Sequence, residues 1–272
     1  MLKKRIYTAV CLAAVLFLIL WSQNEWLFKL FLLAFFCAAS WENARLFGNR
    51  SPVVVAVLAG LVFAGLSLWL TEEMFIWFAI VSVVIWILYL IPSLFRELPV
   101  QGSISGRLYQ FLYWVSILGS FLAVYMLYNQ SALLLLSVLK IVWLADIGAY
   151  FAGRAFGKHK LAPSISPGKT WEGVIGGVVA VLLVASCVLC FTTWQTTLAA
   201  RIFEKYGWIA MICGLVALVA LSILGDLLES KLKRRAGMKD SSQLLPGHGG
   251  VLDRIDSLIP VLPLALLLGM WL

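Results

Sequence analysis

Acidic side chains gather in one stretch of the chain, at the borders of its apolar runs. Four of the five aspartates lie between residues 226 and 256, namely Asp226, Asp240, Asp253 and Asp256. A carboxylate in a membrane segment is expensive to bury, so it is usually paired or functional. Carboxylate oxygens are hard ligands that suit Mg²⁺, which keeps waters and bridges to substrate phosphates. The segment therefore predicts magnesium-assisted phosphate chemistry, with a helix N-cap as the alternative for Asp256.

The residues that follow Asp226 are expected to continue the preceding apolar helix as far as Arg234. Asp226, Ser230 and Lys233 then stand at i, i+4 and i+7 and share one helix face. An acid, a hydroxyl and a base on one stripe suit a metal-bound phosphate, with the acid facing the cation and the lysine facing the oxygens. For Glu229, an ion pair with Lys233 at i+4 is the simpler interpretation.

A glycine-rich turn precedes the last two aspartates. It spans residues 246–250, of which three are glycines, and it leads into Asp253. Glycines let backbone N–H groups approach an anion closely, and a helix that starts near Asp253 would favour phosphate at its N-terminus. Within the turn, His248 either orients a phosphate or supports the backbone.

A second polar loop, residues 152–172, carries Ser166, Lys169 and Thr170 among basic and glycine residues. The run from Gly168 to Thr170 resembles the end of a P-loop, but a P-loop needs a glycine where Pro163 stands and a preceding strand, which we do not expect. The loop still suits a nucleotide or lipid phosphate, and a basic loop on anionic headgroups is the alternative. Asp146 is the expected link between this loop and the aspartate cluster.

Long apolar segments must position these loops. The chain is 62% hydrophobic and 12% charged, whereas a soluble domain is nearer half apolar and a quarter charged. About nine segments are long enough to span a bilayer. They are 6–21, 26–44, 53–70, 74–92, 110–128, 131–151, 173–192, 207–225 and 256–272. The sequence therefore predicts an all-α integral membrane protein.

The charges of the connecting loops predict an orientation. Basic residues recur at the N-terminus and in every second loop, with the segment near Arg201 as a partial exception. By the positive-inside rule the N-terminus and both long loops, 152–172 and 226–255, are cytoplasmic and the C-terminus is outside. The first apolar run has only bulky residues at its end, so we expect a retained helix rather than a cleaved signal.

The remaining composition argues against other classes of function. The net charge of +8 fits membrane topology and anionic lipid, and we expect no nucleic-acid partner. All five cysteines lie in apolar runs, which indicates packing rather than redox or zinc chemistry. We divide the chain into N-terminal transmembrane helices, 1–130, and a catalytic transmembrane region, 131–272.

Residues 230–256 resemble the signature of the phosphatidate cytidylyltransferase (CDP-diacylglycerol synthase) family. The matching positions are Ser230, Leu232, Lys233, Arg234, Lys239, Asp240, Ser242, Leu245, Pro246, His248, Gly249, Gly250, Val251, Asp253, Arg254, Ile255 and Asp256. The stretch from Ala145 to Gly173 is also similar to the family, and the run from Ser40 to Glu42 matches weakly.

The resemblance implies that CTP and phosphatidic acid give CDP-diacylglycerol and pyrophosphate with Mg²⁺, in a bacterial inner membrane. It implies that Asp226 and Asp253 hold the metal and that Lys233 neutralises phosphate, with Asp256 as a further candidate ligand. It also implies a monovalent cation such as K⁺ and a homodimer. The expected substrate contacts are Ser230, Arg234, Lys239, Asp240, His248, Gly249, Gly250, Arg254, Asp146, Ser166, Lys169 and Thr170.

Three other functions are alternatives for this sequence. A CDP-alcohol phosphotransferase would carry an Asp-Gly-x2-Ala-Arg run, which is absent from this sequence. A transporter would show paired repeats and charges near the membrane midplane, whereas most charges here cluster toward one face. A cytidylyltransferase that acts on another lipid phosphate fits the sequence equally well.

Overall fold

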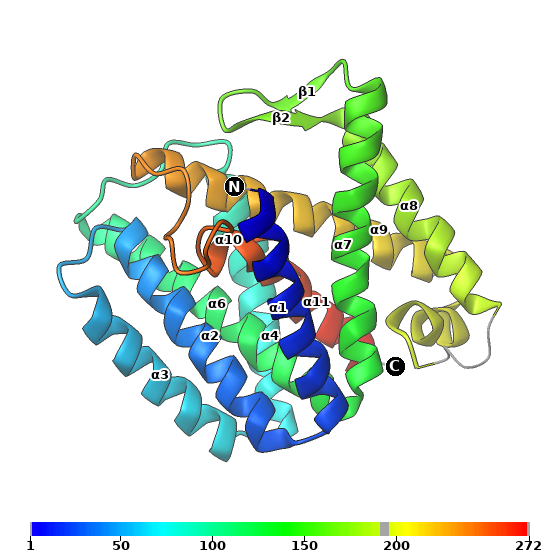
Figure 1. The fold of residues 1–272 in the computed structure, drawn as a ribbon, viewed down its shortest axis with the longest axis horizontal. Helices are drawn as coiled ribbons and strands as arrows, with labels where there is room; N and C mark the ends of the chain where they lie inside the picture. The colour runs from blue at the N-terminus through cyan, green and yellow to red at the C-terminus, as the bar shows by residue number, and fades with distance from the viewer. Residues whose placement is uncertain (1, 191–195, 271–272) are drawn as a thin grey trace.

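The protein is helical almost throughout (Figure 1). The computed structural model describes residues 2–190 and 196–270, so the expected segment ends at 191–192 and 271–272 lie outside the described residues. The helices are α1 Leu2–Ser22, α2 Glu25–Leu46, α3 Pro52–Trp69, α4 Glu72–Ile85, η1 Trp86–Leu90, α5 Ile91–Ser93, α6 Ile104–Gln130, α7 Ala132–Phe156, α8 Trp171–Leu189, α9 Leu198–Arg235, α10 Leu252–Ile255 and α11 Leu258–Met270. A hairpin of β1, Lys160–Ala162, and β2, Ser166–Thr170, separates α7 from α8.

The prediction of an all-α membrane protein is confirmed. Within the described residues, 7 helices are long and apolar enough to cross a bilayer, and two shorter apolar helices cover Val10–Ser22 and Leu258–Gly269. Each segment expected to span the membrane coincides with helix, and 74–92 corresponds to the continuous run of α4, η1 and α5. Pro92 has no N–H to donate, and the chain passes through the π turn of η1 immediately before it. The number of crossings and the orientation stay predictions.

The loop expected at 152–172 contains strands, so the expectation of no strand near Gly168 was wrong. In the antiparallel hairpin Lys160 lies opposite Thr170 and Ala162 opposite Ser166. Strands this short and polar carry no hydrophobic alternation, which is why the sequence did not reveal them. The P-loop is still excluded, because the run from Gly168 to Thr170 lies inside β2 rather than in a phosphate-cradling loop after a strand.

Helix α9 extends beyond the apolar segment expected at 207–225. It is interrupted at Gly207, whose backbone (φ 78°, ψ −173°) lies in a region that favours glycine, and it then runs unbroken to Arg235. The predicted helical continuation past Asp226 is thus confirmed. The polar loop is correspondingly shorter than expected, because its irregular part covers only 236–251.

Helices α7 and α8, which flank the hairpin, pack closely against each other. A side chain at Gly148 of α7 would meet the Ala180 Cβ of α8 at 2.7 Å, and one at Gly177 would meet the Ala145 carbonyl oxygen at 2.8 Å. Small residues let membrane helices approach in this way.

Helix α11 packs against α4, α6 and α9. The boundary expected at residue 130 coincides with the turn between α6 and α7, and the division into two parts stays a prediction.

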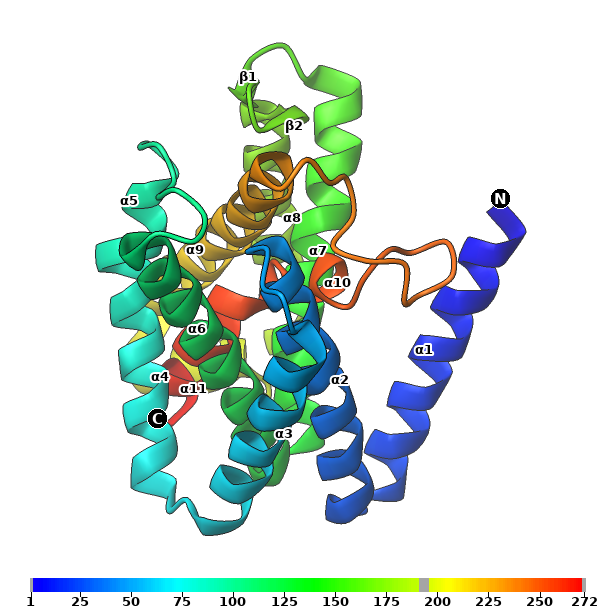
Figure 2. The ribbon, with the colours of Figure 1, turned by 90° about the vertical axis from the view of Figure 1, so that its left-hand side faces the viewer.

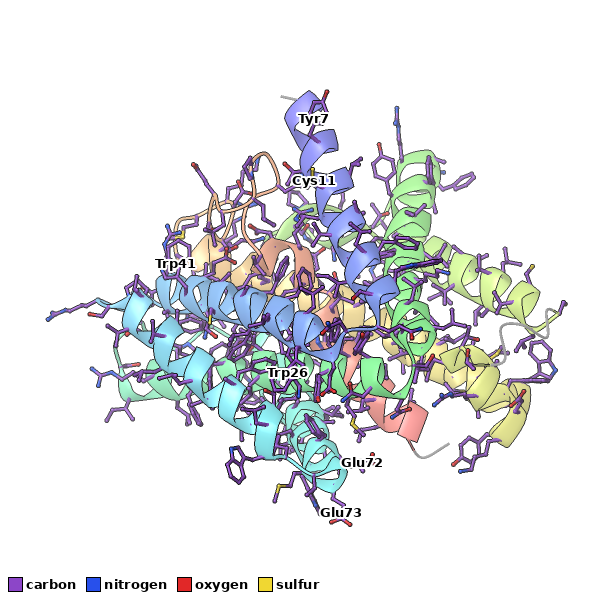
Figure 3. The ribbon with its side chains drawn as sticks, turned by 60° about the horizontal axis from the view of Figure 1, so that its bottom comes forward. Tyr7, Cys11, Trp26, Trp41, Glu72 and Glu73 are labelled. Atoms are coloured by element: carbon purple, nitrogen blue, oxygen red, sulfur yellow. The ribbon has the colours of Figure 1, made fainter. Side chains whose placement is uncertain are left out.

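The irregular polar segments lie toward one end of the helix bundle. Figure 2 shows the hairpin, the loop 236–251 and the start of α1 at the end opposite the turn between α3 and α4. Figure 3 likewise places Tyr7 and Cys11 at the opposite end from Glu72 and Glu73. The hydroxyl of Thr8 donates to the Pro246 carbonyl oxygen at 2.8 Å, so α1 contacts the polar loop directly.

Candidate active site

The C-terminal part of α9 presents the predicted stripe of polar side chains. Ser230 Oγ donates to Asp226 Oδ1 at 3.2 Å, which confirms that the two residues share a face. One turn further on, Lys233 Nζ lies 2.5 Å from Glu229 Oε2. The i,i+4 ion pair expected for Glu229 is therefore confirmed.

Lys233 also joins α9 to α10. Its Nζ donates to Asp253 Oδ1 at 2.6 Å, and the side chains of Glu229 and Asp253 are 0% and 5% exposed. One cation thus neutralises two buried carboxylates, which would be strongly destabilising without a partner.

Asp253 is held by the polar loop as well. Its Oδ2 accepts from the Ser241 N–H at 2.9 Å, the Ser241 hydroxyl at 3.0 Å and the Gly250 N–H at 2.7 Å. Burial alone would raise the pKa of Asp253, but the bonds from Lys233 and Gly250 hold it below its ordinary value. Gly249 has φ +82°, and a Cβ there would lie 2.6 Å from Asp253 Oδ2. Glycine therefore lets this carboxylate approach the backbone.

The second loop reaches the cluster through Lys169. Its Nζ lies 2.7 Å from Asp226 Oδ2, so the two polar segments expected to act together do meet. The direct contact is this ion pair, and Asp146 lies close enough to Lys169 and Asp226 for both charges to act on it. Thr170 is buried, and its hydroxyl accepts from the Gly173 N–H at 3.2 Å as the N-cap of α8. Ser166 lies at the start of β2.

Asp256 lies between α10 and α11. Its Oδ1 accepts from the Ser257 N–H at 2.7 Å. The negative charge of Asp226 lies close enough to act on the carboxylate of Asp256. Two carboxylates that lie close together, as those of Asp226 and Asp256 do, favour a cation between them or a proton on one of them.

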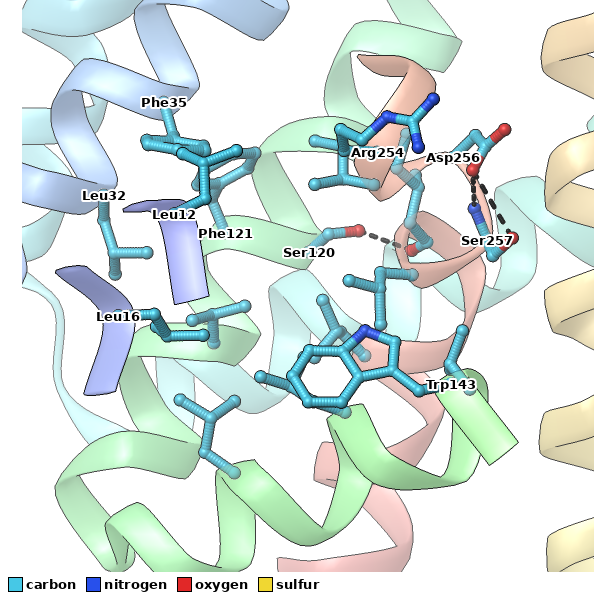
Figure 4. A pocket seen from close by; sticks show the side chains of 18 of the residues that line it. Leu12, Leu16, Leu32, Phe35, Ser120, Phe121, Trp143, Arg254, Asp256 and Ser257 are labelled. Atoms are coloured by element: carbon cyan, nitrogen blue, oxygen red, sulfur yellow. Dashed lines mark hydrogen bonds between the residues drawn. The ribbon is translucent and has the colours of Figure 1, made fainter. Parts of the chain in front are cut away.

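A cavity of about 520 Å³ lies beside these groups. One part of its wall is apolar and comes from α1, α2, α6, α7 and α11, and the other carries Asp146, His248, Asp253, Arg254 and Asp256. Figure 4 shows Leu12, Leu16 and Phe35 on one side, with Arg254 and Asp256 on the other. Asp146 thus joins the site as a lining residue. His248 Nδ1 is buried and has no hydrogen-bond partner within the described part of the chain.

Other predicted residues lie at the periphery. Arg234, Lys239 and Asp240 are exposed, although the backbone next to Asp240 contacts Asp253 through Ser241. Their predicted substrate contacts stay predictions. Gly250 belongs to the site through its N–H, as described above.

Two further residues, without a predicted role, bind polar groups from distant parts of the chain. Glu42 of α2 is fully buried and accepts four hydrogen bonds from the polar loop and α10. Lys231 donates to the carbonyl oxygens of Ser93, Leu94 and Arg96. A signal existed for Glu42, since it is an acid within an apolar helix.

The donor set fits Mg²⁺ better than a metal that needs a complete protein cage. Among residues 2–190 and 196–270, no group of three or more His, Cys, Asp or Glu side chains converges on one point. Mg²⁺ requires only one or two carboxylates and takes its other ligands from water and substrate phosphates. Asp226 and Asp253 offer such oxygens beside lysines that can receive phosphate.

Comparison with known proteins decides the family. A sequence profile described as the cytidylyltransferase family matches residues 3–271. The chain belongs to the cytidylyltransferase family. Within this family, a protein of Haemophilus influenzae named phosphatidate cytidylyltransferase is 37% identical over 286 residues, covering 97% of this chain and 96% of the relative.

Two further relatives carry the same name. The one from Pseudomonas aeruginosa is 38% identical over 267 residues, covering 97% of this chain and 95% of the relative. The one from Staphylococcus aureus is 49% identical over 125 residues, covering 46% of this chain and 44% of the relative. This member of the cytidylyltransferase family thus matches the first two relatives along nearly its whole length.

Proposed function

We propose that this protein is a phosphatidate cytidylyltransferase, which transfers CMP from CTP to phosphatidic acid and yields CDP-diacylglycerol and pyrophosphate. The observation that carries the proposal is the cavity of about 520 Å³, whose wall is apolar on one side and lined by Asp253, Arg254 and Asp256 on the other. A molecule with acyl chains and a phosphate headgroup fits both parts of such a wall.

The chemistry requires little of the protein beyond positioning and charge. An oxygen of the phosphatidate headgroup attacks the α-phosphorus of CTP, the bond to the β-phosphate breaks, and pyrophosphate leaves. A phosphate oxygen is already a nucleophile at neutral pH, so no Ser-His pair is needed to activate it. Lys233, Lys169 and Arg254 are the cations placed to orient phosphates and to offset charge in the transition state.

Mg²⁺ is the proposed cofactor. Asp226 and Asp253 are its proposed ligands, and K⁺ is the proposed monovalent ion beside it. Asp256 is proposed as a third ligand, and its carboxylate would have to move to join them, because the three side chains do not converge on one point among the described residues. When bound, Mg²⁺ supplies charge neutralisation on phosphate oxygens. The carboxylate of Asp253 can still bind a metal ion. Among the described residues, its Oδ1 accepts only from Lys233, whereas its Oδ2 accepts from the three loop donors.

The proposed setting is a bacterial inner membrane, with the polar end of the bundle in the cytoplasm and the protein as a homodimer. The distribution of basic loops supports this orientation, and CTP is a cytoplasmic nucleotide. Cysteine labelling at the ends of α1 and α4 in intact cells would test the orientation, and cross-linking in membranes would test the dimer.

The reaction is tested with purified protein in detergent, phosphatidic acid, Mg²⁺ and CTP labelled on either the α- or the γ-phosphate. We expect the α label in a lipid product and the γ label in pyrophosphate. The γ label in the lipid would indicate a kinase, and no lipid label with any phospholipid acid would refute the proposal.

A cytidylyltransferase that uses another lipid phosphate is the second candidate, because the same cavity accommodates any molecule with apolar chains and a phosphate. The same assay with an isoprenoid-ether phosphate in place of phosphatidic acid separates the two candidates by kcat/KM.

A further inference from the structure

Glu42 is a buried acid without a place in the proposed chemistry. It belongs to α2, one turn before the end of that helix, and it is 0% exposed. An isolated carboxylate in such a position is unfavourable unless hydrogen-bond donors surround it. Glu42 therefore needs partners, and all four that it has come from the far end of the chain.

The four donors are divided evenly between the two carboxylate oxygens. Oε1 accepts from the Ser242 hydroxyl at 2.5 Å and the Val251 N–H at 2.9 Å. Oε2 accepts from the Ser241 hydroxyl at 3.0 Å and the Leu252 N–H at 2.7 Å. One carboxylate thus joins the middle of the loop 236–251 to its last residue and to the first amide of α10, which has no partner within that helix.

Ser241 connects this carboxylate to Asp253. Its hydroxyl lies 3.0 Å from both Glu42 Oε2 and Asp253 Oδ2, so its single proton is shared between the two carboxylates, and its N–H donates to Asp253 at 2.9 Å. Gly250 completes the contact, because a side chain there would collide with Ser241 Oγ and the Glu42 carboxylate. The loop is therefore clamped between two carboxylates, one structural and one in the candidate active site.

We propose that Glu42 is a positioning residue that sets the place of Asp253 from α2, through Ser241 and the first amides of α10. The proposal rests on the proposed function for its kinetic consequence, but the clamp itself can be measured without any turnover.

A substitution by glutamine tests the clamp with minimal change of shape. The amide keeps one acceptor oxygen and replaces the other with NH₂, which can still meet a serine hydroxyl but not a backbone N–H. In Glu42→Gln, either the Val251 or the Leu252 amide must therefore lose its partner. The matched control is Glu25→Gln, because Glu25 lies on the same helix, away from the site, and pairs with Tyr125 and Lys29.

Hydrogen exchange is the readout that does not depend on activity. We expect peptides covering residues 249–254 to exchange faster in Glu42→Gln than in the wild type and to be unchanged in Glu25→Gln. Unchanged exchange in Glu42→Gln would overturn the clamp. This result is informative even if the wild type gives no lipid product, so failure of the clamp and failure of the proposed function are distinguishable.

Kinetics test the link to Asp253. We expect Glu42→Gln to lower kcat about 10- to 100-fold, as for supporting residues around metal ligands, with KM for CTP changed far less. An equal loss in Glu25→Gln, or a loss confined to KM, would overturn the positioning role.

Two serine variants test the proposal even if the Glu42 variant fails to fold. Ser241 and Ser242 both donate to Glu42, but only Ser241 also contacts Asp253. We expect Ser241→Ala to lower kcat clearly more than Ser242→Ala when both are compared per folded molecule. Equal effects would mean that the contact with Glu42 acts on stability alone, which would overturn the proposal.

Discussion

Lys169 Nζ and Asp226 Oδ2 lie 2.7 Å apart, joining the β hairpin to the C-terminal part of α9. The two side chains are 24% and 32% exposed, so the pair is accessible to a ligand rather than sealed in the core. A phosphate or a cation entering the site would meet both charges at once, which ties the hairpin to the chemistry of α9.

The first prediction concerns this pair. Asp226→Asn should abolish measurable turnover, and Lys169→Gln should lower kcat about 100-fold, the order expected for loss of one preorganised charge at a reacting phosphate. The measurement is CDP-lipid formation per folded molecule, with folding checked by size-exclusion chromatography. Near-normal activity in Asp226→Asn would remove this residue from the metal site.

A second prediction separates Lys233 from its helical neighbour Glu229. Lys233→Met leaves two buried carboxylates without a cation, so we expect a loss of about 3–5 kcal/mol in the free energy of unfolding together with loss of turnover. Glu229→Gln keeps the bond between Lys233 and Asp253 and should retain most of the activity. Equal inactivity of both variants would give Glu229 a direct role.

A third prediction uses the cavity wall. Leu16 of α1 lines the cavity, and Leu16→Trp should lower kcat/KM for long-chain phosphatidic acid about tenfold, since overpacking costs roughly 1–3 kcal/mol. The control is Leu61→Trp on α3, where Leu61 is 66% exposed. A dihexanoyl substrate should be less affected by Leu16→Trp, and an equal effect on both chain lengths would argue against this wall as the acyl site.

A fourth prediction assigns Lys231 to stability. It donates to three backbone carbonyl oxygens at the end of α5, those of Ser93, Leu94 and Arg96. Lys231→Gln should lower the unfolding temperature in detergent, because the part-buried carbonyl oxygens of Ser93 and Leu94 lose a charged donor, and a hydrogen bond to a charged group contributes about 1.5–3 kcal/mol. Turnover per folded molecule should stay close to wild type. Lys158→Gln, at an exposed position, is the control for loss of a positive charge.

A fifth prediction concerns the metal. Removal of divalent ions with EDTA should stop turnover, and Mg²⁺ should restore it. Mg²⁺ should also raise the unfolding temperature of the wild type by mass action, but not that of the Asp226→Asn/Asp253→Asn double variant. Full activity in EDTA would contradict the proposed cofactor.

The sequence was informative where periodicity and charge spacing are strong. The stripe of Asp226, Ser230 and Lys233 followed from helical geometry alone. The apolar segments located the helices, although α9 begins at Leu198, well before the segment expected at 207–225. The hairpin at 160–170 was missed, because β1 and β2 are too short to show an alternating pattern. Residues brought together only by packing were also missed.

Glu42 illustrates that limit. Its partners stand 199 and 200 positions away for Ser241 and Ser242, and no local pattern links an acid in the second helix to serines near the end of the chain. The available signal was an acid within an apolar helix. It indicated that Glu42 is important but not which residues it contacts. The direct contact between Lys169 and Asp226 was likewise fixed by tertiary packing rather than by spacing.

The distance in sequence between Glu42 and Ser241 has a consequence for biosynthesis. A ribosome that adds about 5–20 residues per second needs roughly 10–40 s to make the 199-residue separation. Throughout that interval α2 is already available for insertion while its acid has none of its final donors. Until the last helices arrive, the Glu42 carboxyl therefore lacks its final donors and must stay near water, take up a proton or be held by the insertion machinery.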